Sequence, residues 1–423
     1  MNKKFSKLDI VYVSLMIFGF FFGAGNLIFP IFLGMNSGEN LNTAMIFFAI
    51  SEIGFTMLGV IVSSRVNSLE NVEKNMGLLF STLLLTSICL ALGPGVAIPR
   101  AATLAFDMAI IDYIPSFINI NIARAIYTAI FCVVAYYLTK GQNNLFKRIG
   151  KILTPLILIT ITVVLIGVLI KVENIVLPAT GDYLTNPSYK GFIEGYNAMD
   201  SLASLNVGVM AFAILSNIYS EKKETITKYI ALGCLGASVL YFIVYYLLAY
   251  IGRRMAHIYP DSENGAVLLK NSMKYLYGDI GVLLITILFI LACLSAVVSI
   301  VSFSNTYISK RFNIEYNKMS QMILFASFCI STIGLNKILV YSIPILLFIY
   351  PIFFTIILLE ALSKIYSGDI WIYRLTVYVV TCISFLNVAL QFLKIQEINW
   401  IYPTLIVFII LLIYKKYFVK ENR

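Results

Sequence analysis

Residues 18–30 of this 423-residue chain combine three glycines, an asparagine and a proline within a long apolar run. Such residues weaken or interrupt a helix when they occur together. A helix that resumes after a break presents free backbone N–H groups at the positive end of its dipole, which favours an anion such as a carboxylate. Gly23 and Gly25 lack a Cβ, so a ligand can approach the backbone closely. The side-chain carbonyl of Asn26 suits a hard cation such as Na⁺. The alternative is a small-residue face on which helices pack.

A second polar stretch, residues 191–206, contains Asp200. A carboxylate inside a membrane span is costly, so it is a site candidate by default. It could hold a cation, bind a substrate ammonium group or shuttle a proton. The competing interpretation is a carboxylate paired with a neighbouring donor for structural reasons.

A stripe of hydroxyl groups follows further along the chain, where Ser295, Ser299 and Ser302 are spaced i, i+4, i+7 on one helical face. Hydroxyl and carbonyl oxygens are ligands of the kind that bind Na⁺. Serines at this spacing also commonly bond the preceding turn or let helices approach closely. The stripe is therefore compatible with an ion site but does not establish one.

Several charged residues lie within apolar runs. Arg100 and Asp107 share a helical face, and we expect an ion pair between them, or hydrogen bonds from Arg100 to carbonyls freed by Pro94 and Pro99. Glu52 and Glu360 are single acids without a visible partner, and the sequence assigns them no role. The chain contains no nucleophile elbow, phosphate loop or metal-ligand cluster, so an enzyme is disfavoured.

The elements that position these residues are transmembrane helices. The chain is 60% hydrophobic and 12% charged, which is typical of an integral membrane protein. Apolar runs long enough to cross about 30 Å of hydrocarbon predict twelve spans. They are residues 9–33, 41–64, 77–105, 122–139, 150–170, 190–217, 228–251, 279–306, 319–335, 338–362, 371–391 and 399–418.

The net charge of +10 comes from basic residues scattered over short loops, which disfavours nucleic-acid binding. Their distribution follows the positive-inside rule if both termini are cytoplasmic. Each of the six cysteines stands alone in an apolar run, so neither a disulfide framework nor a zinc site is expected.

The predicted interruptions of the first and sixth spans are five spans apart, and the third span is also interrupted between residues 92 and 100. Interruptions in corresponding places are typical of inverted-repeat secondary transporters. We therefore predict one transmembrane domain, with a first repeat over 9–170, a second over 190–362 and two further spans over 371–418. The long connections 171–189 and 252–278 are predicted to be external, as a gate or as passive surface loops.

Several motifs in order resemble those of the bacterial branched-chain amino acid:cation symporter family, within the amino acid-polyamine-organocation superfamily. They are FGAGNLIFP at 22–30, GEN at 38–40, GP at 93–94, AIPRAAT at 97–103, GF at 191–192, EGY at 194–196, MD at 199–200 and LACL at 291–294. The resemblance implies an all-α, twelve-span protein of leucine-transporter-like fold with a five-plus-five inverted repeat. It also implies import of leucine, isoleucine and valine with Na⁺, or with H⁺ in some relatives.

The resemblance further implies site residues. The backbone at Gly23, Ala24 and Gly25 would hold the substrate carboxylate, with Asn26 close by. The sixth-span break would line the pocket with Met199, Asp200, Ser201 and Ser204. A Na⁺ would take carbonyls near Gly19, Phe22 and Ala292 and the hydroxyl of Ser295. The family usually has two adjacent hydroxyl residues here, whereas this chain has Ser295 and Ala296, so Ser299 or water would have to replace the missing ligand.

The resulting hypothesis is a symporter in the bacterial cell membrane that works by alternating access. Its partners would be the amino acid substrate and the lipid bilayer, with no nucleic acid and no obligatory protein partner. The alternatives are the same fold with another amino acid or with H⁺ as the coupling ion, and a membrane amino acid sensor that does not transport.

Overall fold

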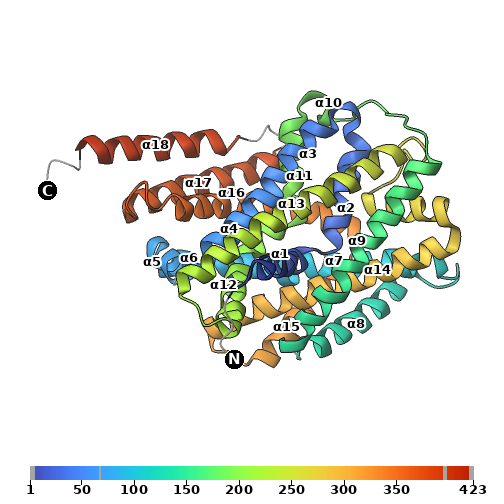
Figure 1. Ribbon diagram of the computed structural model, residues 1–423, viewed down its shortest axis with the longest axis horizontal. Helices are drawn as coiled ribbons and strands as arrows, with labels where there is room; N and C mark the ends of the chain where they lie inside the picture. The colour runs from blue at the N-terminus through green and yellow to red at the C-terminus, as the bar shows by residue number, and fades with distance from the viewer. Residues whose placement is uncertain (1–4, 66–67, 141, 394–397, 419–423) are drawn as a thin grey trace.

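The computed structural model describes residues 5–65, 68–140, 142–393 and 398–418, and within them it contains helices and no strand. Figure 1 shows the helices packed into one bundle, with α18 along its edge beside α17. The helices are α1 (Lys7–Phe21), α2 (Ala24–Ser37), α3 (Leu41–Ala49), α4 (Phe55–Ser63), α5 (Ser68–Met76), α6 (Leu78–Leu90), α7 (Ala97–Ala109), α8 (Ile120–Thr139), α9 (Gln142–Lys171), α10 (Asp182–Thr185), α11 (Pro187–Ala198), α12 (Asp200–Ile218), α13 (Lys223–Met255), α14 (Gly265–Phe312), α15 (Tyr316–Ser331), α16 (Leu335–Ala361), α17 (Ile370–Phe392) and α18 (Ile401–Phe418).

The predicted spans coincide with these helices. Among the described residues, eight helical stretches are long and apolar enough to cross a membrane, and three shorter apolar helices accompany them. The prediction of an all-α, multi-pass membrane protein is confirmed. Residues 1–4 and 419–423, which contain several of the basic residues behind the predicted orientation of the termini, lie outside the described part of the chain.

The first span is broken within the predicted stretch 18–30, and the break takes only two residues. Phe22 and Gly23 are extended between α1 and α2. Gly25 and Asn26 already belong to the first turn of α2, because the Asn26 side chain reaches back and accepts a hydrogen bond from the Gly23 N–H at 2.9 Å. This side chain satisfies a donor that the missing helical turn leaves without a partner.

The sixth span is interrupted at a single residue of the polar stretch 191–206. Met199 has a left-handed backbone with φ of 71°, and it separates α11 from α12. A non-glycine residue in this region is uncommon, and such residues concentrate at functional sites. Because α12 begins at Asp200, the side chains that follow are placed by helical periodicity rather than by an irregular loop.

Two further spans contain wide helical turns. The third has a π-helical turn, η3 (Ala91–Gly95), with a non-helical ψ of −111° at Gly93, which confirms the predicted interruption. The second has a π-helical turn, η2 (Ile50–Gly54), between α3 and α4. No residue pattern in the sequence predicted η2. Turns of this kind frequently occur at functional sites.

The two long connections both pack on α2. In the first, the Thr180 N–H donates to the Asn36 carbonyl at 2.9 Å. The second is mostly helical, since α13 continues to Met255 and α14 begins at Gly265. The Gly265 backbone lies so close to α2 that an added Cβ would be 2.1 Å from the Ile28 carbonyl oxygen. A gating role for either connection stays a prediction.

Close approach of α2 and α13 depends on glycine. A Cβ added at Gly252 would lie 2.1 Å from the Ile31 carbonyl oxygen, and backbone atoms cannot move aside as a flexible side chain can. We expect Gly252→Ala to destabilise the protein by about 1–3 kcal/mol through overpacking, measured as a lower unfolding temperature in detergent. Gly54→Ala is the matched control, because its Cβ would have 3.8 Å to the nearest atom. Equal unfolding temperatures for the two variants would contradict this account.

Candidate functional site

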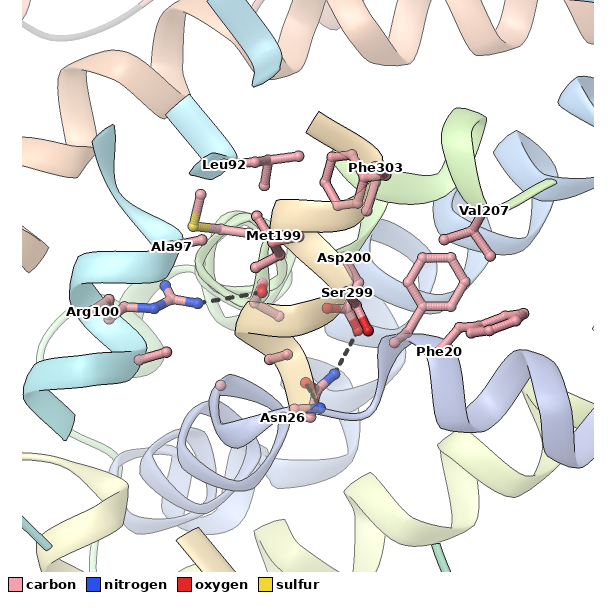
Figure 2. A pocket seen from close by; sticks show the side chains of 18 of the residues that line it. Phe20, Asn26, Leu92, Ala97, Arg100, Met199, Asp200, Val207, Ser299 and Phe303 are labelled. Atoms are coloured by element: carbon pink, nitrogen blue, oxygen red, sulfur yellow. Dashed lines mark hydrogen bonds between the residues drawn. The ribbon is translucent and has the colours of Figure 1, made fainter. Parts of the chain in front are cut away.

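A cavity of about 80 Å³ lies where the two helix breaks meet α7 and α14. Its polar part is formed by Gly23, Gly25, Asn26, Arg100, Asp200 and Ser299. Its apolar part includes Phe20, Leu92, Ala97, Leu104, Met199, Val207, Ile300 and Phe303. Figure 2 shows Asn26 pointing toward Asp200, with Arg100 entering from the other side. A cavity with one polar part and a larger apolar lining is what a small amphiphilic ligand requires.

Asn26 joins the two breaks through one side chain. Its Oδ1 atom accepts from the Gly23 N–H, and its Nδ2 group donates to Asp200 Oδ2 and to the Tyr245 hydroxyl, each at 2.5 Å. The side chain is 2% exposed. Both amide hydrogens are therefore engaged, and Asn26 holds α2, α12 and α13 in one arrangement.

The first turn of α2 faces the cavity. Gly23 and Gly25 line it, and the first N–H groups of a helix have no partner within the helix. An added Cβ at Gly25 would lie 3.0 Å from Arg100 Nη2, so a side chain at this position would crowd the backbone that glycine leaves open to a ligand. The Ala24 backbone continues the turn, while its side chain lies outside the described part of the structure.

Arg100 closes the other side of the polar part. Its Nη1 donates to the Asn197 carbonyl at 2.6 Å and its Nη2 to the Ala198 carbonyl at 3.4 Å. Hydrogen bonding to backbone carbonyls was expected, but these carbonyls belong to the C-terminus of α11 rather than to the turns around Pro94 and Pro99. Asp107 lies elsewhere, beside a separate polar cavity that Arg124 and Lys270 also line.

The four predicted residues of the sixth span divide between two faces of the chain. Met199 and Asp200 line the cavity, followed by Ala203 and Val207 at i+3 and i+7 from Asp200. Ser201 and Ser204 do not line the cavity. The Ser201 hydroxyl lies 2.9 Å from the Thr56 hydroxyl, and Ser204 packs on Gly59 of α4. Contacts with α4 thus take these two predicted pocket residues out of the cavity lining.

The predicted ion ligands of α14 lie beside the first break. Ser299 lines the cavity, and a Cβ at Gly23 would lie 3.1 Å from the Cβ of Ala296. Ser302 donates to the Val298 carbonyl at 2.7 Å, as a structural serine does. Within the described residues, the structure assigns no hydrogen bond to the hydroxyl of Ser295 or Ser299, and Ala292 is fully buried.

The end of α1 contributes a further candidate ligand for the ion, the carbonyl oxygen of Gly19. In a continuous helix the Gly23 N–H would donate to the Gly19 carbonyl, but here it donates to Asn26. The Gly19 carbonyl therefore loses its usual partner, and Phe22 follows in an extended conformation. Carbonyl and hydroxyl oxygens without partners are suitable ligands for a hard cation, so the predicted set at Gly19, Phe22, Ala292, Ser295 and Ser299 is chemically compatible with Na⁺.

Glu52 has no role predicted from the sequence. This residue lies in η2, is 2% exposed, and neither carboxyl oxygen has a hydrogen-bond donor within the described residues. Ser51 and Thr56, which flank it, contact the start of α12, because the Ser201 hydroxyl lies 3.3 Å from the Ser51 carbonyl oxygen and 2.9 Å from the Thr56 hydroxyl. The available signal was the presence of an acid inside a span, but its place beside α12 becomes visible only when the helices pack.

Two solved structures share this fold. Mhp1, a nucleobase-cation-symport-1 family transporter solved in a closed conformation with bromovinylhydantoin bound, has a TM-score of 0.63 at 14% identity and covers 97% of this chain and 92% of its own. MhsT in complex with L-phenylalanine has a TM-score of 0.57 at 16% identity, with coverage of 91% and 99%. The broken first and sixth spans and this likeness define the fold as leucine-transporter-like.

Comparison of the sequence with known proteins shows the family to which this chain belongs. Residues 6–418 match the model of the branched-chain amino acid transport protein family. The branched-chain amino acid permease BrnQ of Bacillus subtilis is 29% identical over 413 residues, 96% of this chain and 93% of that protein. The permease BraB of the same organism is 30% identical over 365 residues, with coverage of 85% and 81%. This chain belongs to that family of membrane transporters, which are not enzymes, and its substrate is a small molecule, an amino acid.

Proposed function

We propose that this protein is a secondary active symporter that imports leucine, isoleucine and valine together with Na⁺ by alternating access. The observation that carries the proposal is the cavity, because it joins the backbone of both broken helices to a large apolar lining. Broken helices of this kind hold substrate and ion near the bilayer midplane in other secondary transporters.

The polar part of the cavity fits an amino acid backbone. The substrate carboxylate binds the backbone at the start of α2, at Gly23, Ala24 and Gly25, where the helix dipole favours negative charge. The N–H groups of Ala24 and Gly25 donate to it, because the Gly23 N–H already donates to Asn26. The substrate ammonium group binds Asp200, which Asn26 holds at the cavity wall. The aliphatic side chain then contacts the apolar lining, which includes Met199, Val207 and Phe303. Such a lining rejects polar side chains but separates leucine from valine only weakly.

The Na⁺ binds between the end of α1 and α14, at carbonyls near Gly19, Phe22 and Ala292 and at the hydroxyls of Ser295 and Ser299. The Gly19 carbonyl, which lacks its usual helical partner, supports this assignment. The hydroxyls of Ser295 and Ser299, which make no hydrogen bond among the described residues, support it as well. Residues 9–170 and 190–362 form the two inverted repeats, and spans 371–418 are additional. Both termini face the cytoplasm of a bacterial cell.

Uptake into proteoliposomes tests this function. Labelled leucine should accumulate when an inward Na⁺ gradient is imposed at fixed membrane potential, and unlabelled isoleucine and valine should compete. Accumulation of leucine driven by an inward H⁺ gradient in the absence of Na⁺ would instead support the proton-coupled alternative. Binding of leucine without accumulation under any gradient would support an amino acid sensor and overturn the symporter proposal.

Ser295→Ala tests the ion site. Removal of one oxygen ligand should raise the Na⁺ concentration for half-maximal uptake by about tenfold, equivalent to about 1.4 kcal/mol, while the order of competing amino acids is unchanged. Ser302→Ala is the matched control, because the Ser302 hydroxyl already donates within α14. The ion assignment is wrong if both variants show the same Na⁺ dependence as the unmodified protein.

A further inference from the structure

We propose that a second amino acid molecule binds in the polar cavity at the C-terminal end of α7, apart from the transport cavity. This second cavity has a volume of about 460 Å³, and it is bounded by the end of α7, the first turns of α8 and α16 and the start of α14. The inference rests on the proposed function for its class of ligand, an amino acid with an apolar side chain. It adds a binding site that neither the helix breaks nor the Na⁺ ligands include.

Asp107 supplies an acceptor that lacks a donor. Its carboxyl group lines the second cavity, and its Oδ1 atom is buried without a hydrogen-bond partner among the described residues. Lys270 lines the same cavity, but its ammonium group pairs with Asp112 at 2.7 Å. An ionised carboxylate only accepts hydrogen bonds, and its burial is costly when none is made. A donor on a ligand, such as an ammonium group, would satisfy Asp107.

Arg124 supplies the opposite charge. Its Nη1 donates to Asn121 Oδ1 at 3.1 Å, and its guanidinium lies over the Phe106 ring, 5.5 Å from the ring centroid. Its Nε is buried and has no partner among the described residues. An added Cβ at Gly334, where φ is +91°, would lie 3.1 Å from Arg124 Nη1, so glycine leaves room for the guanidinium. The planar donors of arginine suit a carboxylate ligand.

The two charges share a cavity without contacting each other. No ion pair joins Asp107 to Arg124 in the described part of the chain, whereas Lys270 and Asp112 pair in the same cavity. A single ion would satisfy only one of the two groups. An amino acid carries an ammonium and a carboxylate group on one carbon, so it can satisfy both. The remaining lining provides apolar contacts for its side chain, from Met108, Ile111, Val267, Ile333 and Leu335.

The two cavities follow one another along one face of α7. Arg100 and Leu104 line the transport cavity, and Asp107 and Met108 line the second, at spacings that keep all four on one side of the helix. The seven residues from Arg100 to Asp107 rise by about 10 Å, so both cavities can be occupied at once. The Asp112 side chain is 61% exposed, which opens the second cavity to solvent. With both termini cytoplasmic, this end of α7 faces the outside of the cell.

The stoichiometry of leucine binding tests the second site. Equilibrium dialysis of the purified protein with labelled leucine at saturating Na⁺ should give two leucine molecules per chain. Asp107→Asn keeps the shape of the side chain but removes the charge that holds the ammonium group. The apparent Kd of the second site should rise at least about tenfold, so one leucine remains at the same concentrations. Asp279→Asn is the matched control, because Asp279 is an exposed acid that does not line the cavity, and it should bind two.

Gly25→Val separates the two sites from the other direction. It closes the transport cavity and should leave one bound leucine per chain, which the additional change Asp107→Asn should remove. Arg124→Gln should act like Asp107→Asn, and it replaces that variant if Asp107→Asn does not fold. Unfolding temperatures in detergent establish which variants are folded.

The failure of this site is distinguishable from the failure of the proposed function. One leucine per chain in the unmodified protein, lost in Gly25→Val and kept in Asp107→Asn, overturns the second site and leaves the transport cavity assigned. One leucine lost in Asp107→Asn but kept in Gly25→Val supports the second site and overturns binding at the helix breaks. Absence of leucine binding in the unmodified protein overturns both.

Discussion

Gly25→Val is expected to lower leucine uptake at least about 100-fold while membrane insertion and folding are retained. A Cβ at this position would lie 3.0 Å from Arg100 Nη2, 3.5 Å from the Phe29 ring and 3.6 Å from the Ala198 carbonyl. The two methyl groups of valine extend further and occupy the space above the first N–H groups of α2. A misplacement of about 1 Å in a site of this kind can cost about 100-fold in rate.

Gly25→Ala provides a graded comparison. Its single methyl group meets the end of the Arg100 side chain, which can shift by a few tenths of an ångström, so uptake should fall less than in Gly25→Val. Gel filtration and unfolding temperature in detergent establish that both variants are folded. Normal uptake by Gly25→Val would refute the assignment of the substrate carboxylate to the start of α2.

Asn26→Asp is the second substitution with a large expected effect. The two side chains have the same shape, but the change replaces the Nδ2 donor with an oxygen that faces Asp200 Oδ2. A hydrogen bond to a charged group becomes a contact between acceptors, and the bond to the Tyr245 hydroxyl must reverse its direction. Breaking a buried, charged hydrogen bond costs about 2–5 kcal/mol, so transport should fall by about 30-fold or more.

Asn42→Asp is the matched control. Asn42 Oδ1 accepts from the Tyr246 hydroxyl at 2.8 Å in an exposed position, and a carboxylate accepts the same bond. Asn42→Asp should therefore transport leucine normally. Leucine uptake into proteoliposomes measures both variants at one pH and one Na⁺ gradient. Equal transport by the two variants would mean that the link between the helix breaks is not needed for function.

Helix breaks were predictable from sequence because their causes are local. Gly23 and Gly25 weaken a helix wherever they occur, and the polar run around Met199 interrupts an apolar span. The exact boundaries were not predictable. The Asn26 side chain caps α2 and so shortens the first break to Phe22 and Gly23, and one left-handed residue, Met199, is enough for the second.

Contacts across the bundle could not be read from local patterns. Ser201 and Ser204 lie in the predicted sixth-span segment but face α4, because the packing of α12 against α4 decides which side chains enter the cavity. Arg100 was placed beside its own prolines by sequence proximity, whereas it bonds the end of α11. The position of Glu52 beside the start of α12 likewise follows only from the packing of the second span against α12.

By itself, the sequence determined a multi-pass helical protein, its broken first and sixth spans and its family, because hydrophobic run length, helix-breaking residues and ordered motifs are properties of neighbouring positions. Only the tertiary structure decided which groups meet in the cavity. Asn26 bonds Asp200 and Tyr245, which are 174 and 219 residues away along the chain. Such pairs are set by how the helices pack, which no short stretch of sequence specifies.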